Sequence, residues 1–170
     1  MPISLLPRLI AETVTDLSPK LLQERGIHLL MLDFDNTLVP YTRDEPTPQV
    51  RQWLRAMMDS GISLCVVSNS KRPRVQQFCS QHGLPCVTHA RKPFSKGIRR
   101  CMESFQLRPQ VCALVGDQIY TDTLGANCAG VFSILVKPIH NHNIWLKLRH
   151  VAELPFIMLA WKRRLHREKS

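Results

Sequence analysis

Residues 27–38 read Ile27-His28-Leu29-Leu30-Met31-Leu32-Asp33-Phe34-Asp35-Asn36-Thr37-Leu38. The apolar run predicts a buried strand, and the acids that follow it predict carboxylates at the carboxyl end of that strand. Because side chains alternate along a strand, Asp33 and Asp35 can project toward the same side. The alternative interpretation is a plain acidic turn capped by Asn36 and Thr37, since short motifs also occur by chance.

Two carboxylates in this arrangement indicate phosphate chemistry. Their charges repel unless a cation lies between them, and Mg²⁺ needs only one or two carboxylates when waters and a substrate phosphate complete its coordination. One carboxylate can attack phosphorus to form an aspartyl-phosphate. The other can donate a proton to the leaving oxygen and later take one from water.

The chain around this segment alternates between apolar runs and helical patterns. Further strands are expected at residues 62–67, 85–88, 111–115 and 131–136, and helices at 48–59, 73–82, 95–105 and 119–129. This alternation predicts an α/β protein with three layers and a mainly parallel sheet. Ligands of such sheets lie beyond the carboxyl ends of the strands, so the polar residues that end the first, second and fourth strands should converge there.

The chain is expected to have three parts. Residues 1–26 form a helical lead-in, with an apolar turn over Pro7–Ala11 and a helix over Ser18–Gly26 that begins with a cap and a proline. Residues 27–138 form the core. Residues 139–170 form a basic amphipathic helical segment.

Composition limits the possible partners and location. The chain has 170 residues, 44% hydrophobic and 21% charged, as expected for an ordinary globular domain. Its net charge of +10 indicates an anionic partner, which is a phosphate substrate, an acidic membrane surface or nucleic acid. Six cysteines without a C-x-x-C pair predict free thiols in a reducing compartment. No signal peptide or membrane-spanning run is recognisable, so a cytoplasmic location is expected.

The C-terminal segment leaves two interpretations open. Residues 144–161 place Trp and aliphatic side chains beside lysine and arginine, and residues 162–167 are strongly basic. An interfacial helix has this composition, which predicts peripheral binding at the inner, anionic face of a membrane. A terminal helix docked on the sheet, with a solvated basic tail, has the same pattern.

Four segments in order resemble the motifs of haloacid dehalogenase (HAD) superfamily phosphatases: Asp33–Leu38, Ser68-Asn69-Ser70, Lys92-Pro93, and Gly116-Asp117 with Asp122. The similarity extends from residue 28 to about residue 136, and it is closer to the subfamily IIIA, YqeG-type proteins. Eukaryotic relatives of those proteins include phosphatidylglycerophosphate phosphatases. The resemblance implies a Rossmann-like HAD fold. The short loop after Leu38 leaves room for a minimal cap or none, so the site should be open to large or membrane-embedded phosphates.

The resemblance also implies roles for the acids. Asp33 would be the nucleophile and a Mg²⁺ ligand. Asp35 would be the general acid and base, with its backbone carbonyl on the metal. Asp117 would supply a further metal carboxylate. Asp122 would either bind the metal or, as we prefer, organise its water shell.

The remaining implied roles concern the phosphoryl group. Ser68 would donate a hydrogen bond to it, helped by the backbone N–H of Asn69. Lys92 would neutralise its oxygens, because a loose transition state spreads negative charge over them. Lys96 is the rival for this role, since several cations crowd the same region. A plain turn at residues 68–70 and a solvated Lys92 are the structural alternatives.

The expected function is therefore a Mg²⁺-dependent phosphomonoesterase at a membrane surface, with phosphatidylglycerophosphate as the implied substrate. The alternative is a non-catalytic basic module that binds nucleic acid or ribosomes. A binding module has no need of Asp33, Asp35, Lys92 and Asp117 together, so the enzyme is favoured over a nucleic-acid partner.

Overall fold

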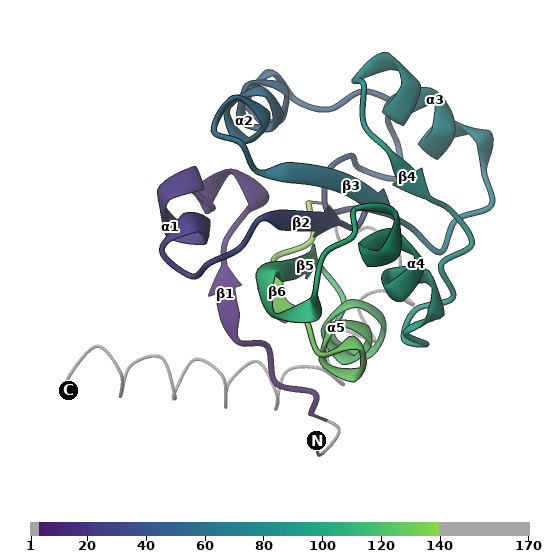
Figure 1. Ribbon diagram of the computed structural model, residues 1–170. Helices are drawn as coiled ribbons and strands as arrows, with labels where there is room; N and C mark the ends of the chain where they lie inside the picture. The colour runs from purple at the N-terminus through teal and green to yellow at the C-terminus, as the bar shows by residue number, and fades with distance from the viewer. Residues whose placement is uncertain (1–3, 140–170) are drawn as a thin grey trace.

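The computed structural model describes residues 4–139 (Figure 1). Six parallel strands form one sheet in the order β1-β6-β5-β2-β3-β4. The strands are β1 (Leu9–Ala11), β2 (Leu29–Leu32), β3 (Ser63–Val67), β4 (Cys86–Val87), β5 (Cys112–Gly116) and β6 (Phe132–Val136). The predicted parallel α/β fold is confirmed.

Helices cover both faces of the sheet and make it the middle of three layers (Figure 1). One face carries α1 (Pro19–Gln23), α2 (Pro48–Asp59) and α3 (Pro73–Gln81), and the other carries α4 (Lys96–Ser104) and α5 (Leu124–Ala129). Alternate residues of β2 pack into the two cores, Leu30 and Leu32 on the first face and Leu29 and Met31 on the second. Burial on both faces explains why β2 is apolar throughout.

The helix starts follow the predicted signals. Prolines occupy the first turn of α1, α2 and α3, where the missing N–H has no cost. Ser18 caps α1 and Thr47 caps α2, and each side chain accepts a backbone hydrogen bond, at 3.1 and 3.3 Å respectively. Helix α1 ends at Gln23, three residues before the predicted stop at Gly26.

The prediction of a turn at Pro7–Ala11 is wrong, because Leu9–Ala11 form the edge strand β1. Leu9 pairs with Ile134 of β6, and the Arg8 N–H donates to the carbonyl of Ser133 at 3.0 Å. The side chain of Ile10 is buried against Leu135. A strand of three residues is too short to show the alternation of apolar and polar side chains in its sequence. Its conformation is set by pairing with β6, more than 120 residues away.

The helix predicted at residues 119–129 consists of two parts. A wide π-helical turn, η3 (Ile119–Thr123), precedes α5. The Asp122 carboxylate accepts a hydrogen bond from the Gln118 N–H at 3.1 Å at the start of this turn. Such wide turns are rare and often occur at functional sites.

The sheet order places the ends of β2 and β5 side by side. After β2 the chain moves outward through β3 and β4, and then returns to β5 on the other side of β2. The Asp33 N–H continues the pairing by donating to the Val115 carbonyl at 2.9 Å. This reversal of strand order is where ligands bind in open α/β sheets. In the described chain, residues 40–47 between Val39 and α2 form a loop with no inserted domain.

All six cysteines are free thiols, as predicted, and four of them are buried. Within residues 4–139, no helix combines the length and the apolar character needed to cross a bilayer. The predicted basic amphipathic segment at 139–170 lies, apart from residue 139, outside the described residues.

Candidate active site

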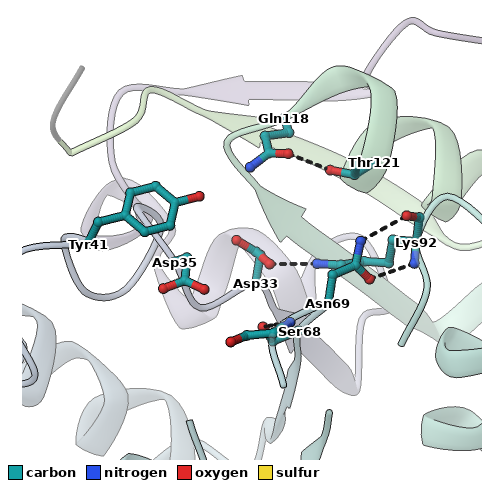
Figure 2. A pocket seen from close by; sticks show the side chains of 9 residues that line it. Asp33, Asp35, Tyr41, Ser68, Asn69, Lys92, Gln118 and Thr121 are labelled. Carbon is teal, nitrogen blue, oxygen red and sulfur yellow. Dashed lines mark hydrogen bonds and ion pairs between the residues drawn. The ribbon is translucent and has the colours of Figure 1, made fainter. Parts of the chain in front are cut away.

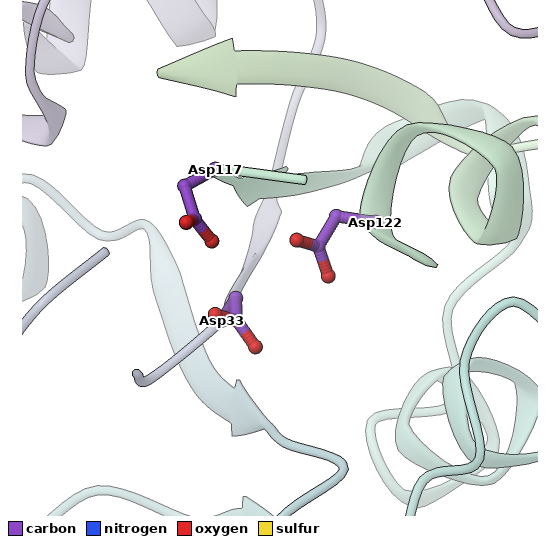
Figure 3. Close-up of side chains that lie close together, drawn as sticks. All are labelled: Asp33, Asp117 and Asp122. Atoms are coloured by element: carbon purple, nitrogen blue, oxygen red, sulfur yellow. The ribbon is translucent and has the colours of Figure 1, made fainter. Parts of the chain in front are cut away.

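Three carboxylates meet at the carboxyl edge of the sheet (Figure 3). Asp33 follows β2, Asp117 follows β5 and Asp122 lies in the π-helical turn. One oxygen from each residue lies within 4.8 Å of the other two. Their exposed fractions are only 6%, 6% and 1%. Like charges buried this closely repel strongly, so the cluster needs a positive counter-charge.

Lys92 supplies part of that charge. Its Nζ lies 2.6 Å from Oδ1 of Asp33 and 2.7 Å from Oδ1 of Asp122, and its side chain is 1% exposed. Burial alone would lower the pKa of Lys92, but the two carboxylates, Asp122 first, outweigh burial and raise this pKa above its ordinary value. For Asp122, an acid, burial has the opposite effect and raises the pKa, although the charge of Lys92 opposes this rise. The rival Lys96 is exposed, so the structure brings Lys92 to the acids and leaves Lys96 at the surface.

Asn69 fixes the backbone of Lys92. Its side-chain amide donates to the Lys92 carbonyl at 2.8 Å and accepts from the Lys92 N–H at 2.6 Å (Figure 2). The sequence analysis predicted only that the backbone N–H of Asn69 donates to the phosphoryl group. It did not predict this pair of side-chain hydrogen bonds. Asn69 therefore links the loop after β3 to the loop that carries the lysine.

Asp35 stands beside the cluster with its side chain 17% exposed. Burial, and then the charge of Asp33, raise the pKa of Asp35, and the cations Arg74, Arg72 and Lys92 partly offset the rise. A carboxyl group whose pKa is raised keeps a proton to higher pH, which suits a proton donor.

A small pocket of about 70 Å³ opens over these residues (Figure 2). Its lining side chains come from the segments that follow β2, β3, β4 and β5: Asp33, Asp35, Tyr41, Ser68, Asn69, Ser70, Lys92, Gln118 and Thr121. Ser68 is buried, and its Oγ accepts a hydrogen bond from the Ser70 N–H at 3.0 Å. That bond leaves the Ser68 hydroxyl proton available for an acceptor in the pocket.

The donor set fits a hard divalent cation. Three buried carboxylates outnumber the single lysine among them, and carboxylate oxygens are the ligands that Mg²⁺ prefers. Both oxygens of Asp122 have protein partners, the Lys92 ammonium and the Gln118 N–H. The Thr37 hydroxyl lies 3.4 Å from both Asp33 Oδ2 and Asp117 Oδ1, so it connects the two acids on the side away from Lys92. Asp33, Asp117 and Asp122 are thus the three acids that could hold a metal.

Gly116 makes room for Asp122, which gives a first prediction. A Cβ at residue 116 would lie 2.4 Å from Cγ of Asp122, which is too close for two non-bonded carbon atoms. The Gly116→Ala variant must therefore displace a carboxylate held by Lys92 and the Gln118 N–H. We expect kcat for phosphate release to fall by about tenfold or more, because small misplacements at reacting centres are costly. Steady-state kinetics measure the fall, with the exposed Cys128→Ala as a control. An unchanged kcat would contradict the positioning of Asp122 by this contact.

The sheet gathers three acids, a buried lysine and a serine turn at its switch point, which is an arrangement suited to phosphate-ester chemistry. Sequence comparison agrees, because the family model described as haloacid dehalogenase-like hydrolase matches residues 12–130. The chain is also 33% identical over 161 residues to "Probable phosphatase YqeG" of Bacillus subtilis (strain 168), covering 95% of this chain and 94% of that protein. The chain belongs to the haloacid dehalogenase-like hydrolases.

Solved structures show the same fold at low identity. An uncharacterized protein from Listeria monocytogenes serotype 4b is 17% identical with a TM-score of 0.56, covering 69% of this chain and 84% of that one. The cobalt-bound deoxy-D-mannose-octulosonate 8-phosphate phosphatase (YrbI) of Haemophilus influenzae is 13% identical with a TM-score of 0.54, covering 74% of this chain and 75% of that one. The expected HAD-type phosphatase of YqeG type is confirmed. The relation to phosphatidylglycerophosphate phosphatases stays a prediction.

Proposed function

We propose that this phosphatase is a Mg²⁺-dependent phosphomonoesterase that works through an aspartyl-phosphate on Asp33. The observation that carries the proposal is the contact of a buried, charged lysine with a strand-end aspartate at the mouth of a polar pocket. The Lys92 ammonium lies against the Asp33 carboxylate, and a carboxylate oxygen is the group that can attack phosphorus.

In the first half-reaction, a carboxylate oxygen of Asp33 forms a bond to phosphorus while the bond from phosphorus to the leaving oxygen breaks. Asp35 gives its proton to that leaving oxygen. In the second half-reaction water attacks the phosphorus of the aspartyl-phosphate, Asp35 takes the proton of the water, and free phosphate and the Asp33 carboxylate are restored. The raised pKa of Asp35 supports this exchange of roles.

Charge on the transferring group is balanced by fixed groups. Lys92 neutralises phosphoryl oxygens, and the Ser68 hydroxyl and Asn69 N–H donate hydrogen bonds to them. Asp33, the backbone carbonyl of Asp35 and Asp117 would hold Mg²⁺, and Asp122 would organise its water shell. Bound Mg²⁺ would neutralise the acids and polarise the phosphoryl oxygens.

The substrate that we propose is a phosphate on a large or membrane-embedded molecule, with phosphatidylglycerophosphate as the leading candidate. The small pocket accommodates a phosphoryl group, so the rest of the substrate must extend outward. Beside the catalytic lysine, the surface presents the exposed cation Arg91 and the side chain of Phe94, which is 74% exposed. The exposed cation and the exposed ring support peripheral binding to an anionic membrane. The non-catalytic nucleic-acid module is not favoured, because it does not explain the buried cluster.

A phosphate-release assay tests the function. We expect hydrolysis of p-nitrophenyl phosphate in Mg²⁺ and its loss in EDTA, with recovery when Mg²⁺ is returned. A parallel panel offers phosphorylated lipid in anionic and in neutral vesicles, sugar phosphates, nucleotides and phosphopeptides. Preference for the lipid in anionic vesicles would support the membrane substrate. Equal rates in Mg²⁺ and in EDTA would overturn the metal requirement, and a preference for a soluble phosphate would overturn the lipid.

A further inference from the structure

Arg74 lies outside the four motifs, and its guanidinium group contacts many partners while largely buried. It lies in the first turn of α3, and its side chain is 12% exposed. On one side its Nη1 lies 3.4 Å from Oδ1 of Asp35. On another its carbon Cζ lies over the ring of Phe34, 5.1 Å from the centroid. The arginine thus contacts two consecutive residues of the strand-end motif.

The same guanidinium group also holds the loop that follows the motif. Its N–H groups donate to the carbonyls of Pro40 at 3.1 Å, Tyr41 at 3.3 Å and Arg43 at 2.5 Å. Its Nε lies 3.4 Å from Oδ1 of the exposed Asp44. The planar guanidinium group carries five N–H donors that point in different directions, whereas lysine has a single ammonium group. A lysine therefore could not replace Arg74 here.

This loop forms one wall of the pocket. Tyr41 lines the pocket, and Figure 2 shows its ring next to Asp35 on the same side of the site. In the described chain nothing larger than this loop lies between β2 and α2, so the wall depends on a short segment. Without Arg74, three backbone carbonyls and the Asp35 carboxylate would lose a shared donor.

We propose that Arg74 is a positioning residue that fixes the Asp35 carboxylate toward the leaving group and fastens residues 40–44 as a wall of the pocket. The inference rests on the proposed function of Asp35 as the proton donor. Arg74 touches no reacting atom, and it acts on the reaction through the orientation of Asp35 and the placement of Tyr41.

The dependence of the rate on the leaving group separates this role from a general structural one. An alkyl phosphate needs its leaving oxygen protonated, whereas p-nitrophenolate leaves readily without a proton. In Arg74→Met we expect kcat/KM, which reports the steps up to departure of the leaving group, to fall about tenfold or more for an alkyl phosphate such as glycerol phosphate and less than about threefold for p-nitrophenyl phosphate. Arg74→Lys keeps the charge without the fork and should resemble Arg74→Met.

Arg55→Met is the matched control. It removes an exposed cation of α2 that forms no ion pair within residues 4–139 and does not act on the Asp35 carboxyl group. The control should leave the ratio of the two kcat/KM values unchanged. Equal loss on both substrates in Arg74→Met, full activity in Arg74→Lys, or the same change of ratio in Arg55→Met would each overturn the proposal.

Hydrogen exchange tests the anchor without catalysis. The backbone amides of residues 41–44 should exchange faster in Arg74→Met than in the wild type, while those of β2 and β5 stay protected. If the wild-type protein released no phosphate, the proposed function would fail, and the exchange data would still decide the anchoring. Unchanged exchange in the loop would overturn it.

Discussion

Asp33→Asn should abolish phosphate release, with a loss of about 10³-fold or more in kcat. An amide oxygen does not attack phosphorus effectively, so the variant cannot form the aspartyl-phosphate. The substitution preserves shape, and its neighbours can keep their places. A phosphate-release assay at saturating substrate measures the loss. The exposed carboxylate Glu103 on α4 supplies a control, since Glu103→Gln removes the same charge far from the pocket.

A second measurement connects Asp33 to the metal. Mg²⁺ binds the folded protein and should raise its melting temperature, and the rise should be smaller in Asp33→Asn because a ligand is lost. The Glu103→Gln control should respond to Mg²⁺ as the wild type does. Equal phosphate release by the wild type and Asp33→Asn would rule out Asp33 as the nucleophile. An equal thermal response would rule it out as a ligand.

Lys92→Met should damage both stability and catalysis. The variant leaves Asp33 and Asp122 buried without the cation that lies 2.6 and 2.7 Å from them. Breaking a buried ion pair by removing one partner costs roughly 3–5 kcal/mol, so chemical denaturation in EDTA should show a drop of that order in the free energy of unfolding. We also expect kcat in Mg²⁺ to fall by about 10²-fold or more, because a fixed positive charge is lost at the transferring phosphoryl group.

Lys96→Met is the matched control for Lys92→Met. Lys96 follows four positions later, is exposed at the start of α4, and was the rival candidate for the same role. Its replacement should change the free energy of unfolding by less than about 0.5 kcal/mol, as is usual at the surface. Similar effects of the two substitutions would contradict the distinct role of Lys92.

Much of the site could be predicted because it lies at strand ends. Asp33, Ser68 and Asp117 each follow an apolar run, and in a parallel sheet such ends share an edge. The rule that the carboxyl ends of parallel strands share one edge therefore predicts that these residues meet, although they are far apart in sequence. Lys92 follows the short strand β4 and was named from its motif, but only the structure separates it from Lys96.

What the sequence did not reveal depends on contacts across the fold. In the sequence Arg74 looks like an ordinary surface arginine at the start of a helix. Its proposed positioning role depends on hydrogen bonds to carbonyls more than 30 residues away. The amide of Asn69 and the missing side chain of Gly116 likewise matter only because of particular neighbours. No local periodicity or spacing carries such information, because the contacts arise after the sheet has formed.

The pairing of β1 with β6 has a consequence for how the chain is made. Leu9 leaves the ribosome well before its partner Ile134, which lies more than 120 residues further along the chain. Until then β1 has no place to pair, and the outer side of the sheet cannot be finished. Such a distant closure slows folding, since an entropic cost comes before any gain. The nascent chain must therefore keep β1 unpaired until β6 has been translated.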